Sequence, residues 1–570
     1  MRKYMISAKT KIAFFAAAVV LACSSSAFAN ATITIVNLDG PNEGFNDPAP
    51  AAPVGGNTGT TLGQQRLIAF QYAASIWGAT LDSNVPIVIS SSFDPLAANV
   101  LGSAGATNIF AFASTGGVGL FPGAEFTNTW YGSALADKRV GIDINPGAAD
   151  IRARFSSNFN FYLGLDNNHG ANPDLVAVLL HEFGHGLNFQ TFVNTANGSQ
   201  ILGLTDIFAR HLLDTTTGLH WNEMTDAQRQ ASAINYGRLV WDGAHVTTDL
   251  PSVLSLGSPE VRVTTPAVIA GPYQFGTAAF GPAIGSPNVS GSIVAAVDAA
   301  NAAGPSTTDG CTAFTNAGAV AGKIALIERG TCGFALKARN ATNAGAIGAI
   351  IYNNAANVNA APPGMADDGV NGVFVTIPTV SIRTADGAAI IAQLGGGVTG
   401  SIAVDLTIRA GADALGRARL YAPIPLVSGS SVSHYDTVAR RNLLMEPVIN
   451  GDLTHNLTAP DDLTLELLRD VGWFPDADLD GVSDEIDCEP HSDFSPTLVI
   501  GGCDTAVTNT LFANGCTVSD LISHIAANSG NHGNFVNGIA HLTDELRNAG
   551  LINGNQKGKI QSCTAGSNLP

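Results

Sequence analysis

Apolar residues follow two different spacings in the first part of the chain. A capping box formed by Thr61 and Gln64 precedes apolar residues at every third or fourth position, which predicts a helix through Leu67, Phe70, Ala74 and Trp77. The runs VPIVISSSF and RVGIDI are short and rich in β-branched residues, so they are predicted to be strands. Further on, Asn172 and Pro173 predict the cap and first residue of a second helix. This helix runs through LVAVLL and is expected to be buried, because it is apolar on all sides.

The composition changes between Val261 and Thr407. Alanine, glycine and valine dominate here, and two β-branched runs, GKIALIERG and AIGAIIYNN, flank the helix-compatible stretch FALKARNATNAGA. Strands that alternate with helices predict a separate α/β unit.

The C-terminal region contains shorter helical patterns. PDDLTLELLRDVGW predicts a short amphipathic helix with Asp461 near its start and Gly472 at its end. Two further helical patterns lie around Val518–Ala527 and between Phe535 and Leu546. Four cysteines surround them, and the sequence does not choose among their three possible disulfide pairings: Cys488, Cys503, Cys516 and Cys563.

The N-terminus has the pattern of a secretory signal. Basic residues precede an apolar run from Ile12 to Cys23, and the small residues up to Ala29 fit a signal peptidase site, so cleavage before Asn30 is expected. The apolar run is too short to span a bilayer, which takes ~20 residues, and no later segment reaches that length. We therefore expect an exported protein without a membrane span. A lipid anchor at Cys23 is the rival prediction, which the sequence VLAC fits poorly.

Charge and composition narrow the class of protein. The 570 residues carry a net charge of −19, and the pI is near 4.9, so the surface repels the phosphates of nucleic acid. Hydrophobic residues make up 45% of the chain, which is ample for about three or four domains. Cleavage of the signal removes Cys23 and leaves six of the seven cysteines, an even number that suits disulfides in an exported protein.

The second predicted helix carries two histidines four residues apart, with a glutamate directly after the first. Residues i and i+4 lie on one face of a helix, so His181 and His185 can direct two imidazole nitrogens at one metal ion. Glu182 is rotated off the metal axis but can reach a water in the open position as a general base. This pattern predicts zinc-dependent amide hydrolysis. The alternative, a chance coincidence on a core helix, buries a charged Glu182 without a partner, which is costly.

Catalytic zinc takes three protein ligands, so the helix leaves one ligand to find. In the metzincin pattern HExxHxxGxxH, the third ligand follows a glycine turn, but here Asn188 stands at the glycine position and Thr191 at the histidine position. Asparagine tolerates the left-handed backbone conformation, so the turn is expected to remain although the local ligand is missing. The candidates lie further along the chain: Asp206, His211, His220, Glu223, His245, His434 and His455.

His434 differs from the other candidates in its surroundings. It lies in SGSSVSHYDTVARRNLLMEP, which places Met445 eleven residues later. The histidine helix, SHY and LLMEP together resemble leishmanolysin-type metzincins, in which an inserted segment separates the third ligand from the helix and a methionine turn lies beneath the zinc. The resemblance implies that His181, His185 and His434 are the zinc ligands, that Glu182 is the general base and that Met445 is the turn methionine.

The segment between the two halves of this motif resembles a second family. GKIALIERGTCGFALKARNATNAGAIGAIIYNN is similar to the protease-associated domain, a module of many secreted peptidases, and the resemblance extends over Val261–Thr407. It implies a disulfide between Cys311 and Cys332, worth ~3 kcal/mol by the chain-entropy model. We expect the insert to restrict or guide polypeptide access to the cleft. A passive folding module is the alternative.

The acidic stretch DADLDGVSDEID has the spacing of a calcium-binding loop. Oxygen ligands fall at positions 1, 3, 5, 7, 9 and 12, with Gly481 at position 6 for the turn. The loop resembles those of thrombospondin type 3 and dockerin modules, which implies a structural Ca²⁺, and a solvated acidic linker is the alternative. The predicted ligands are Asp476, Asp478, Asp480, the carbonyl of Val482, Asp484 and Asp487. The histidines of the tail lack the spacing of a further metal site: His524, His532 and His541.

These features together predict an exported zinc metalloendopeptidase of mixed α/β, or α+β, architecture that acts on proteins or peptides. The alternative functions are a catalytically silent binding or adhesion protein with the same fold and a zinc hydrolase of a non-protein amide. Natural substrate and oligomeric state are not indicated. The predicted segments are a signal at 1–29, two catalytic parts at 30–260 and 408–475, the protease-associated insert at 261–407, the calcium loop at 476–490 and a helical, cysteine-containing tail at 491–570.

Overall fold

The structure is a computed structural model, and it describes residues 31–111, 126–302, 304–474, 484, 487–512 and 514–569. The chain divides into two compact units. The larger consists of Ile33–Trp77 and Val85–Trp473, and the smaller contains Phe474–Pro570. The larger unit therefore holds the histidine helix and the predicted insert, and the smaller holds the four C-terminal cysteines.

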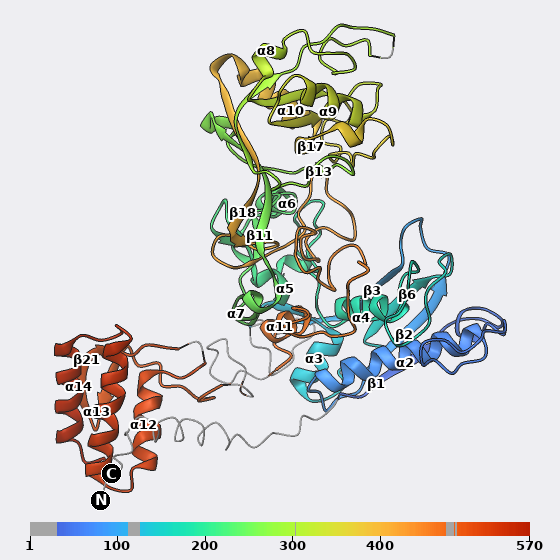
Figure 1. The fold of residues 1–570 in the computed structure, drawn as a ribbon. Coiled ribbons are helices and arrows are strands. Elements are labelled where there is room, and N and C mark those ends of the chain that lie inside the picture. Colours follow the sequence, from blue (N-terminus) through green and yellow to red (C-terminus); the bar gives the residue numbers. More distant parts are fainter. Residues whose placement is uncertain are drawn as a thin grey trace, which may run out of the picture. The chain divides into compact units, whose positions relative to one another are not determined.

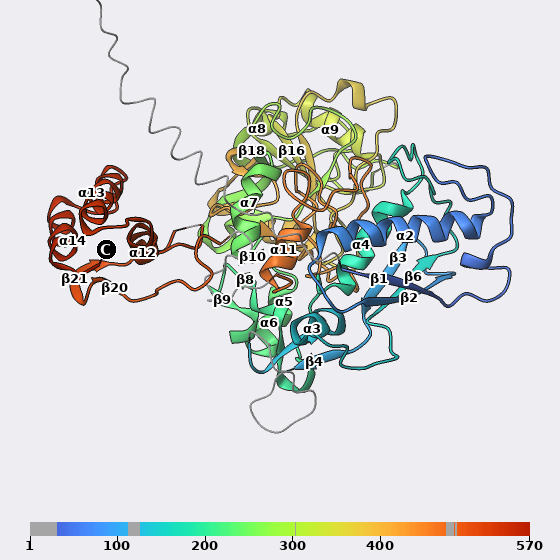
Figure 2. The ribbon, with the colours of Figure 1, turned by 90° about the horizontal axis from the view of Figure 1, so that it is seen from below.

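A four-stranded sheet begins the larger unit. It consists of β1 (Ile33–Asn37), β2 (Ile87–Asp94), β6 (Ile151–Ser156) and β3 (Gly102–Ala106) in this order, and β3 is an antiparallel edge strand beside three parallel strands. Two helices, α2 (Leu62–Thr80) and α4 (Leu175–Gly186), lie side by side against it (Figure 2), and the indole N–H of Trp77 donates to the carbonyl of Leu180 at 3.2 Å. Aromatic rings fill the space between helices and sheet, with Phe70 and Phe155 4.9 Å apart.

The first predicted elements have mixed outcomes. The helix predicted around Phe70 is α2, and VPIVISSSF contains β2, so both predictions are confirmed. The strand predicted at RVGIDI is wrong, because its first two residues end helix α3 (Ser133–Val140) and Gly141, at φ 79°, stops that helix. The strand that pairs with β2 is instead β6, in which buried and exposed side chains alternate.

An eight-stranded sheet is formed by the middle part of the larger unit's sequence, residues 256–409. Its order is β12-β11-β18-β14-β15-β16-β17-β13, and the neighbours from β14 to β17 are parallel. GKIALIERG contains β15, AIGAIIYNN contains β16 and FALKARNATNAGA contains α9, so the predicted α/β alternation is confirmed. The elements are β11 (Leu256–Thr265), β12 (Gly271–Tyr273), β13 (Gly276–Thr277), β14 (Val289–Ala295), α8 (Ala317–Val320), β15 (Ile324–Glu328), α9 (Phe334–Asn343), β16 (Gly348–Tyr352), β17 (Thr379–Ile382), α10 (Thr384–Gln393) and β18 (Val398–Arg409).

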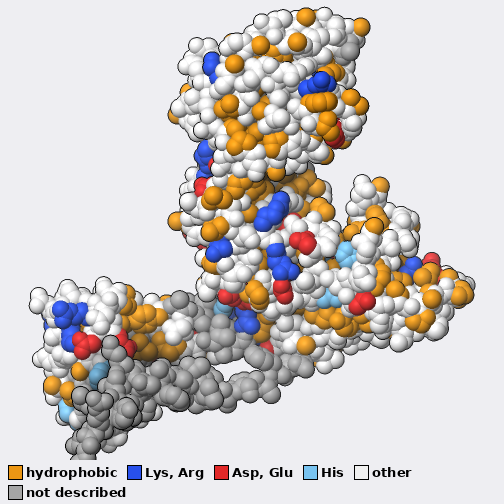
Figure 3. All heavy atoms as spheres, viewed as in Figure 1, with side chains coloured by type: hydrophobic (Ala, Val, Ile, Leu, Met, Phe, Trp, Pro, Cys, Tyr) orange, Lys and Arg blue, Asp and Glu red, His pale blue; other side chains and the backbone are white. Residues whose placement is uncertain are grey.

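Both faces of this sheet are buried. Along β15, Ile324 and Leu326 pack into one apolar cluster with Ile390 of α10, and Ala325 and Ile327 pack into another. The strands are continuous apolar runs because each has a core on either side. On the face shown in Figure 3, few charged side chains lie over this lobe, in keeping with the 13% charged residues of the chain.

The two ends of the insert lie next to each other, so the chain leaves and re-enters the rest of the larger unit at the same place. Strands β11 and β18 run antiparallel along most of their length (Figure 1), and the N–H of Ala410 donates to the carbonyl of Ser255 at 2.9 Å. Just outside them, β10 (Leu239–Trp241) and β19 (Ala418–Arg419) pair within a sheet of order β19-β10-β8-β9. Backbone pairing thus brings together chain segments far apart in sequence and carries the loop after β19 back towards α4.

Short elements complete the larger unit around these sheets. A three-stranded sheet of order β4-β5-β7 lies among them. They are β4 (Ile109–Ala111), β5 (Thr129–Gly132), β7 (Thr205–Asp206), α5 (Ile207–Arg210), β8 (Leu212–Asp214), β9 (Leu219–His220), α6 (Asp226–Ser232), α7 (Ala244–Val253) and α11 (Thr464–Asp470).

The smaller unit is a hairpin with three helices: β20 (Thr497–Ile500), β21 (Cys503–Thr508), α12 (Val518–Asn528), α13 (His532–Asn548) and α14 (Gly554–Gly566). The two predicted helical patterns are confirmed as α12 and α13, whereas α14, which has few apolar residues, was not predicted. Disulfides Cys488–Cys516 and Cys503–Cys563 select one of the three pairings. Within the described ranges of the whole chain, no helix has both the length and the apolarity to cross a membrane.

Candidate metal centre

Helix α4 starts two residues later than predicted. Its N-cap is Asp174, whose Oδ1 accepts the backbone N–H of Val176 at 2.9 Å, so Asn172 and Pro173 lie before the helix. A carboxylate is a favourable cap because it accepts an otherwise unpaired N–H and lies at the positive end of the helix dipole. Every residue of α4 is buried, as its apolar pattern predicted.

Three histidines converge beside α4. His181 and His185 lie on one face of the helix, and His434 comes from the loop after β19. Their Nε2 atoms form a nearly equilateral triangle, with separations of 3.2 Å between His181 and His185, 3.3 Å between His185 and His434, and 3.3 Å between His434 and His181. All three side chains are buried, with 4–8% of each residue exposed.

Main-chain carbonyls hold each of these rings from behind. The Nδ1 atom of His181 lies 2.7 Å from the carbonyl oxygen of Leu444, that of His185 2.8 Å from Phe189, and that of His434 2.7 Å from Ser430. A carbonyl oxygen only accepts, so each Nδ1 carries the proton and each Nε2 presents a lone pair to the common point. Burial lowers the pKa of His181 to about 4 and of His185 to about 3, and it lowers the pKa of His434 well below its usual value, so the rings are neutral.

The donor set fits a zinc ion. Three ligands ~2.0–2.1 Å from one tetrahedral ion stand about 3.3 Å from one another, and the three Nε2 atoms have this spacing. Neutral imidazole is a common zinc ligand, and three protein ligands with one open position are the pattern of catalytic sites. The described residues offer one other group of three close ligand-type side chains, Cys488, Cys516 and His524, but its two sulfurs are joined in a disulfide.

A turn at Leu444 and Met445 lies beneath the helix. Met445 is fully buried, and its Sδ would be 2.9 Å from a Cβ placed on Gly184, so the sulfur lies against the helix backbone between the two histidines. The N–H of Tyr435 donates to the carbonyl of Met445 at 2.9 Å, which ties the turn to the segment that carries His434.

Two acidic residues that the sequence did not single out support this turn. Asp462 Oδ2 accepts the N–H of Leu444 at 2.7 Å, and Glu446 Oε1 accepts the N–H of Leu443 at 2.9 Å. Burial raises the pKa of Asp462 to about 6 and that of Glu446 to about 8. Asp461, which was predicted to start the following helix, instead pairs with Arg441 at 2.5 Å. The two adjacent aspartates look alike in sequence, and only the fold separates their roles.

Glu182 lies next to the histidine triangle with one oxygen free. It is buried, and its Oε2 has no hydrogen-bond partner among the described residues. Burial raises the pKa of Glu182 to about 8, although the backbone N–H of Ala104 in β3 opposes the rise. Gly102, also in β3, lies so close that a Cβ there would come within 2.6 Å of Glu182 Oε1. The edge strand β3 therefore forms one wall of the site.

The turn after α4 has the predicted left-handed residue. Asn188 has φ 84°, and its Oδ1 accepts the N–H of Gly132 at 3.0 Å, so this asparagine supports the turn as a glycine would and also fixes it to β5. Thr191, at the position of the missing local ligand, donates through Oγ1 to Asp206 at 2.8 Å. Asp206 in turn caps α5 by accepting the N–H of Ala209 at 2.7 Å.

The remaining candidates for the third ligand have other contacts. His455 Nε2 lies 2.9 Å from Asp174 Oδ2, and His220 Nε2 lies 2.6 Å from Asp242 Oδ2. Glu223 accepts the backbone N–H of His220 at 2.8 Å. His211 stacks on Trp241 with ring centroids 4.9 Å apart, and His245 lies near the start of α7. None of these residues joins His181 and His185 in the histidine group.

A cavity of about 220 Å³ lies beside the N-terminal half of α4. Asp174 and Ala177 of α4 line it, together with Leu101 before β3 and residues of the loop 449–453. Ala177 is one turn before His181, and Leu101 precedes the glycine that faces Glu182. The cavity thus reaches α4 one turn before His181, while the three histidines and Glu182 are not among its lining residues.

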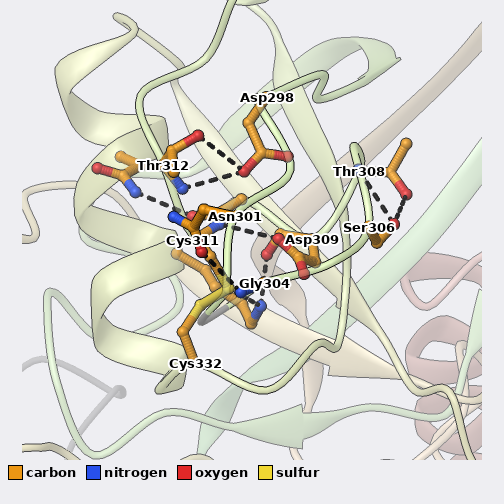
Figure 4. The surroundings of a disulfide bond; sticks show 12 residues. Asp298, Asn301, Gly304, Ser306, Thr308, Asp309, Cys311, Thr312 and Cys332 are labelled. Atoms are coloured by element: carbon orange, nitrogen blue, oxygen red, sulfur yellow. Dashed lines mark hydrogen bonds between the residues drawn. A yellow bond between two sulfur atoms is a disulfide. The ribbon is translucent and has the colours of Figure 1, made fainter.

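The other predicted sites differ in how many of their residues the structure describes. The disulfide between Cys311 and Cys332 is present, with a Cα separation of 5.8 Å, and Figure 4 shows it beside Asp298 and Asp309. Positions 1–30, with the signal and Cys23, lie outside the described residues, so export by a signal stays a prediction. The calcium loop also stays a prediction, because only two of its ligands are described, Asp484 and Asp487, whereas four lie outside: Asp476, Asp478, Asp480 and Val482.

Comparison with known proteins identifies the insert. Residues 289–390 match the family model of the PA domain. The chain is 45% identical over 87 residues to human ER degradation-enhancing alpha-mannosidase-like protein 3, covering 15% of this chain and 9% of that protein. It is 53% identical over 60 residues to an aminopeptidase of Pseudomonas aeruginosa strain UCBPP-PA14, covering 10% of this chain and 11% of the aminopeptidase. The chain thus spans about a tenth of the length of these curated relatives.

Solved structures give only weak likeness to the chain as a whole. A zinc aminopeptidase from Bacillus subtilis is 19% identical and covers 35% of this chain and 41% of its own, with a TM-score of 0.19. The described architecture is a mixed α/β, multidomain one that contains a PA domain and disulfides.

Proposed function

We propose that the chain is a zinc-dependent metalloendopeptidase related to the leishmanolysin-type metzincins, with His181, His185 and His434 as zinc ligands and Glu182 as general base. The observation that carries the proposal is the triangle of Nε2 atoms 3.2–3.3 Å apart, each on a ring whose Nδ1 donates to a main-chain carbonyl. Buried lone pairs without donors cost free energy, and a cation at their common point offsets that cost.

The chain's own groups divide the work of hydrolysis. A bound zinc ion would polarise the substrate carbonyl and lower the pKa of water. Burial alone favours the protonated form of Glu182, and the positive charge of a bound zinc ion would favour the carboxylate. As the carboxylate, Glu182 Oε2, which is free of other partners in the described part of the chain, takes a proton from the attacking water and passes it to the leaving amine. The carbonyls of Leu444, Phe189 and Ser430 keep the three rings from rotating.

The relatives support peptidase chemistry only in part. The alpha-mannosidase-like protein matches 15% of this chain and the aminopeptidase 10%, and because their names point to different reactions, these short matches do not specify the reaction. The assignment as a peptidase therefore rests on the histidine site. The PA domain is consistent with it, because this module occurs in many secreted peptidases. Three disulfides among the described residues favour an oxidising, extracellular compartment for the mature protein.

The predicted role of the insert follows from its place in the chain. It separates the two halves of the histidine site, and β11 and β18 connect it to both. We expect it to restrict or guide polypeptide access to the cleft. Replacing Val261–Thr407 by a short linker should change cleavage of folded proteins more than cleavage of short peptides, and activity unchanged from the wild type on both substrates would favour a passive folding module.

The proposed activity is tested by Glu182→Gln on the full chain. Glutamine keeps the shape of the side chain but cannot take a proton, so casein cleavage should fall ~10²–10⁴-fold while zinc content stays near that of the wild type. Zinc is measured by atomic emission on protein dialysed against trace metal. Wild type and variant with the same low background rate would favour a silent binding protein, and cleavage confined to non-peptide amides would favour the other alternative.

An aminopeptidase is the second candidate, because one of the relatives bears that name. An aminopeptidase requires a free α-amino group, whereas an endopeptidase cleaves within a chain. An internally quenched peptide with an acetylated N-terminus and an amidated C-terminus separates the two. Its cleavage supports the endopeptidase, and cleavage only after removal of the acetyl group supports the aminopeptidase.

A further inference from the structure

Gly102 is the first residue of the edge strand β3, opposite Phe155 of β6. Its φ does not lie in the left-handed region, so the backbone there does not itself require a glycine. The reason for the glycine must lie in what surrounds it.

The missing side chain of Gly102 leaves room for Glu182. A Cβ on Gly102 would lie 2.6 Å from Glu182 Oε1 and 2.8 Å from its Cδ and Cγ, closer than carbon atoms approach without displacement. Neither partner moves easily. Gly102 is paired within the sheet, and Glu182 lies on a buried helix between two histidines whose rings are fixed by carbonyls. The added methyl group would therefore displace the carboxylate.

We propose that Gly102 is a positioning residue for Glu182: the bare backbone of β3 lets the carboxylate lie against the strand, within reach of the Ala104 N–H, with Oε2 free for proton transfer. The catalytic meaning of this contact rests on the proposed function, but the contact itself does not. A misplacement of about 1 Å in a reacting group can cost ~10²-fold in rate.

Another glycine of the same strand offers a matched control. A Cβ on Gly105 would meet only the end of the Gln190 side chain, at 3.2 Å from Oε1 and 3.4 Å from Nε2, and that flexible group can turn aside. Gly105→Ala makes the same chemical change in the same strand without touching Glu182. Any general loss from adding a methyl group to β3 appears in both variants.

The first measurement compares Gly102→Ala and Gly105→Ala in the full chain on a peptide substrate. For Gly102→Ala we expect kcat to fall ~10–100-fold, with KM within about twofold and zinc content unchanged. Gly105→Ala should stay within about twofold of the wild type. Equal kcat values for the two variants would overturn the proposal.

The second measurement needs no activity. Gly102→Ala should lower the thermal unfolding midpoint by a few degrees in the wild-type background and leave it nearly unchanged in a Glu182→Ala background, because the clashing atoms are then gone. The same fall in both backgrounds, or failure of both to fold, would indicate a general strand defect and overturn the contact. A wild type that cleaves no peptide would overturn the proposed function. The unfolding midpoints in the two backgrounds would still show whether Gly102 makes room for the side chain of Glu182.

Discussion

Two clusters of polar side chains differ in what the chain supplies to them. One contains groups of both charges, and the other contains only neutral groups with lone pairs. In the PA-domain lobe, Lys337 is fully buried, and its ammonium donates to the carbonyl of Asp309. The carboxylates of Asp309, Asp298 and Glu328 attract it, and they oppose the burial that lowers its pKa. Beside α4, three neutral imidazoles converge, and their Nε2 atoms, all of them acceptors, face one another at 3.2–3.3 Å.

The difference distinguishes a structural cluster from a candidate metal centre. In the first cluster the chain supplies both signs of charge, so the buried ammonium of Lys337 has its carboxylate partners within the chain, and these groups link β15, α9 and the disulfide region. In the second cluster the chain supplies only lone pairs, fixed in orientation by carbonyls on the far side of each ring. Buried acceptors without donors call for a ligand, and the geometry points to a cation.

The largest expected effect comes from removing one corner of the histidine triangle. His434→Ala should reduce zinc from about one per chain towards zero and lower peptide cleavage more than ~10⁴-fold, beyond what one proton-transfer group supplies. His455→Ala is the control, because that histidine was also a candidate in sequence but pairs with Asp174. Metal analysis and kinetics on both variants check this. Zinc retained by His434→Ala and lost by His455→Ala would reverse the assignment.

The next largest effect should come from the complete cluster. Lys337→Met keeps much of the side-chain volume but leaves buried carboxylates without their cation, which should cost ~3 kcal/mol of stability in the PA-domain lobe. Lys323→Met, at a partly exposed lysine of the same lobe, should cost little. Hydrogen exchange of peptides from β15 and β16 in the full chain measures the local effect. Unchanged protection in Lys337→Met would show that the ammonium does not balance these carboxylates.

The parts of the histidine site that lie close together in sequence were easier to predict than the parts that lie far apart. His181 and His185 follow from helical spacing alone. His434 and Met445 could be recognised only through the short motifs SHY and LLMEP, because what returns this loop to α4 is backbone pairing between distant segments. That pairing involves the two-residue strand β19, which has no sequence pattern of its own. The insert's strands were predictable because two-sided burial makes them continuous apolar runs.

Contacts that depend on atomic placement could not be predicted. GSAGA in β3 contains no β-branched or alternating pattern, so neither the strand nor the close approach of Gly102 to Glu182 was evident. Asp461 and Asp462 are neighbours of the same type, yet one is partly exposed and pairs with Arg441 while the other is buried under the methionine turn. Propensity cannot separate them, because tertiary contacts decide.

These two aspartates give a sharper test of how the triangle is held. Asp462 accepts at both oxygens, from Leu444 on one and from Thr464 on the other. Asparagine has only one acceptor oxygen, so Asp462→Asn must lose a bond, loosen the turn and lower zinc affinity ~10–100-fold through His181. Competition with a chromophoric chelator measures this. Asp461→Asn is the control, and equal affinities in the two variants would show that the turn does not orient His181.

The smallest expected effect concerns His220, which already has a carboxylate partner within the chain. A hydrogen bond to Asp242 raises the pKa of His220, with help from the charges of Asp242 and Glu223 and against partial burial. Because the folded-state pKa lies above the unfolded value, the stabilisation is fully present below pH 6.5 and is lost as pH rises through the folded pKa. His220→Gln should remove this pH dependence of stability, which for a partly exposed pair amounts to less than ~1 kcal/mol.

Urea unfolding followed by tryptophan fluorescence, from about pH 6 to about pH 9, measures this pH dependence. Asp242→Asn should remove most of the same dependence, and an identical slope in wild type and both variants would place the titration elsewhere. Unlike the three histidines beside α4, His220 finds its partner within the chain, so its loss should leave zinc content unchanged.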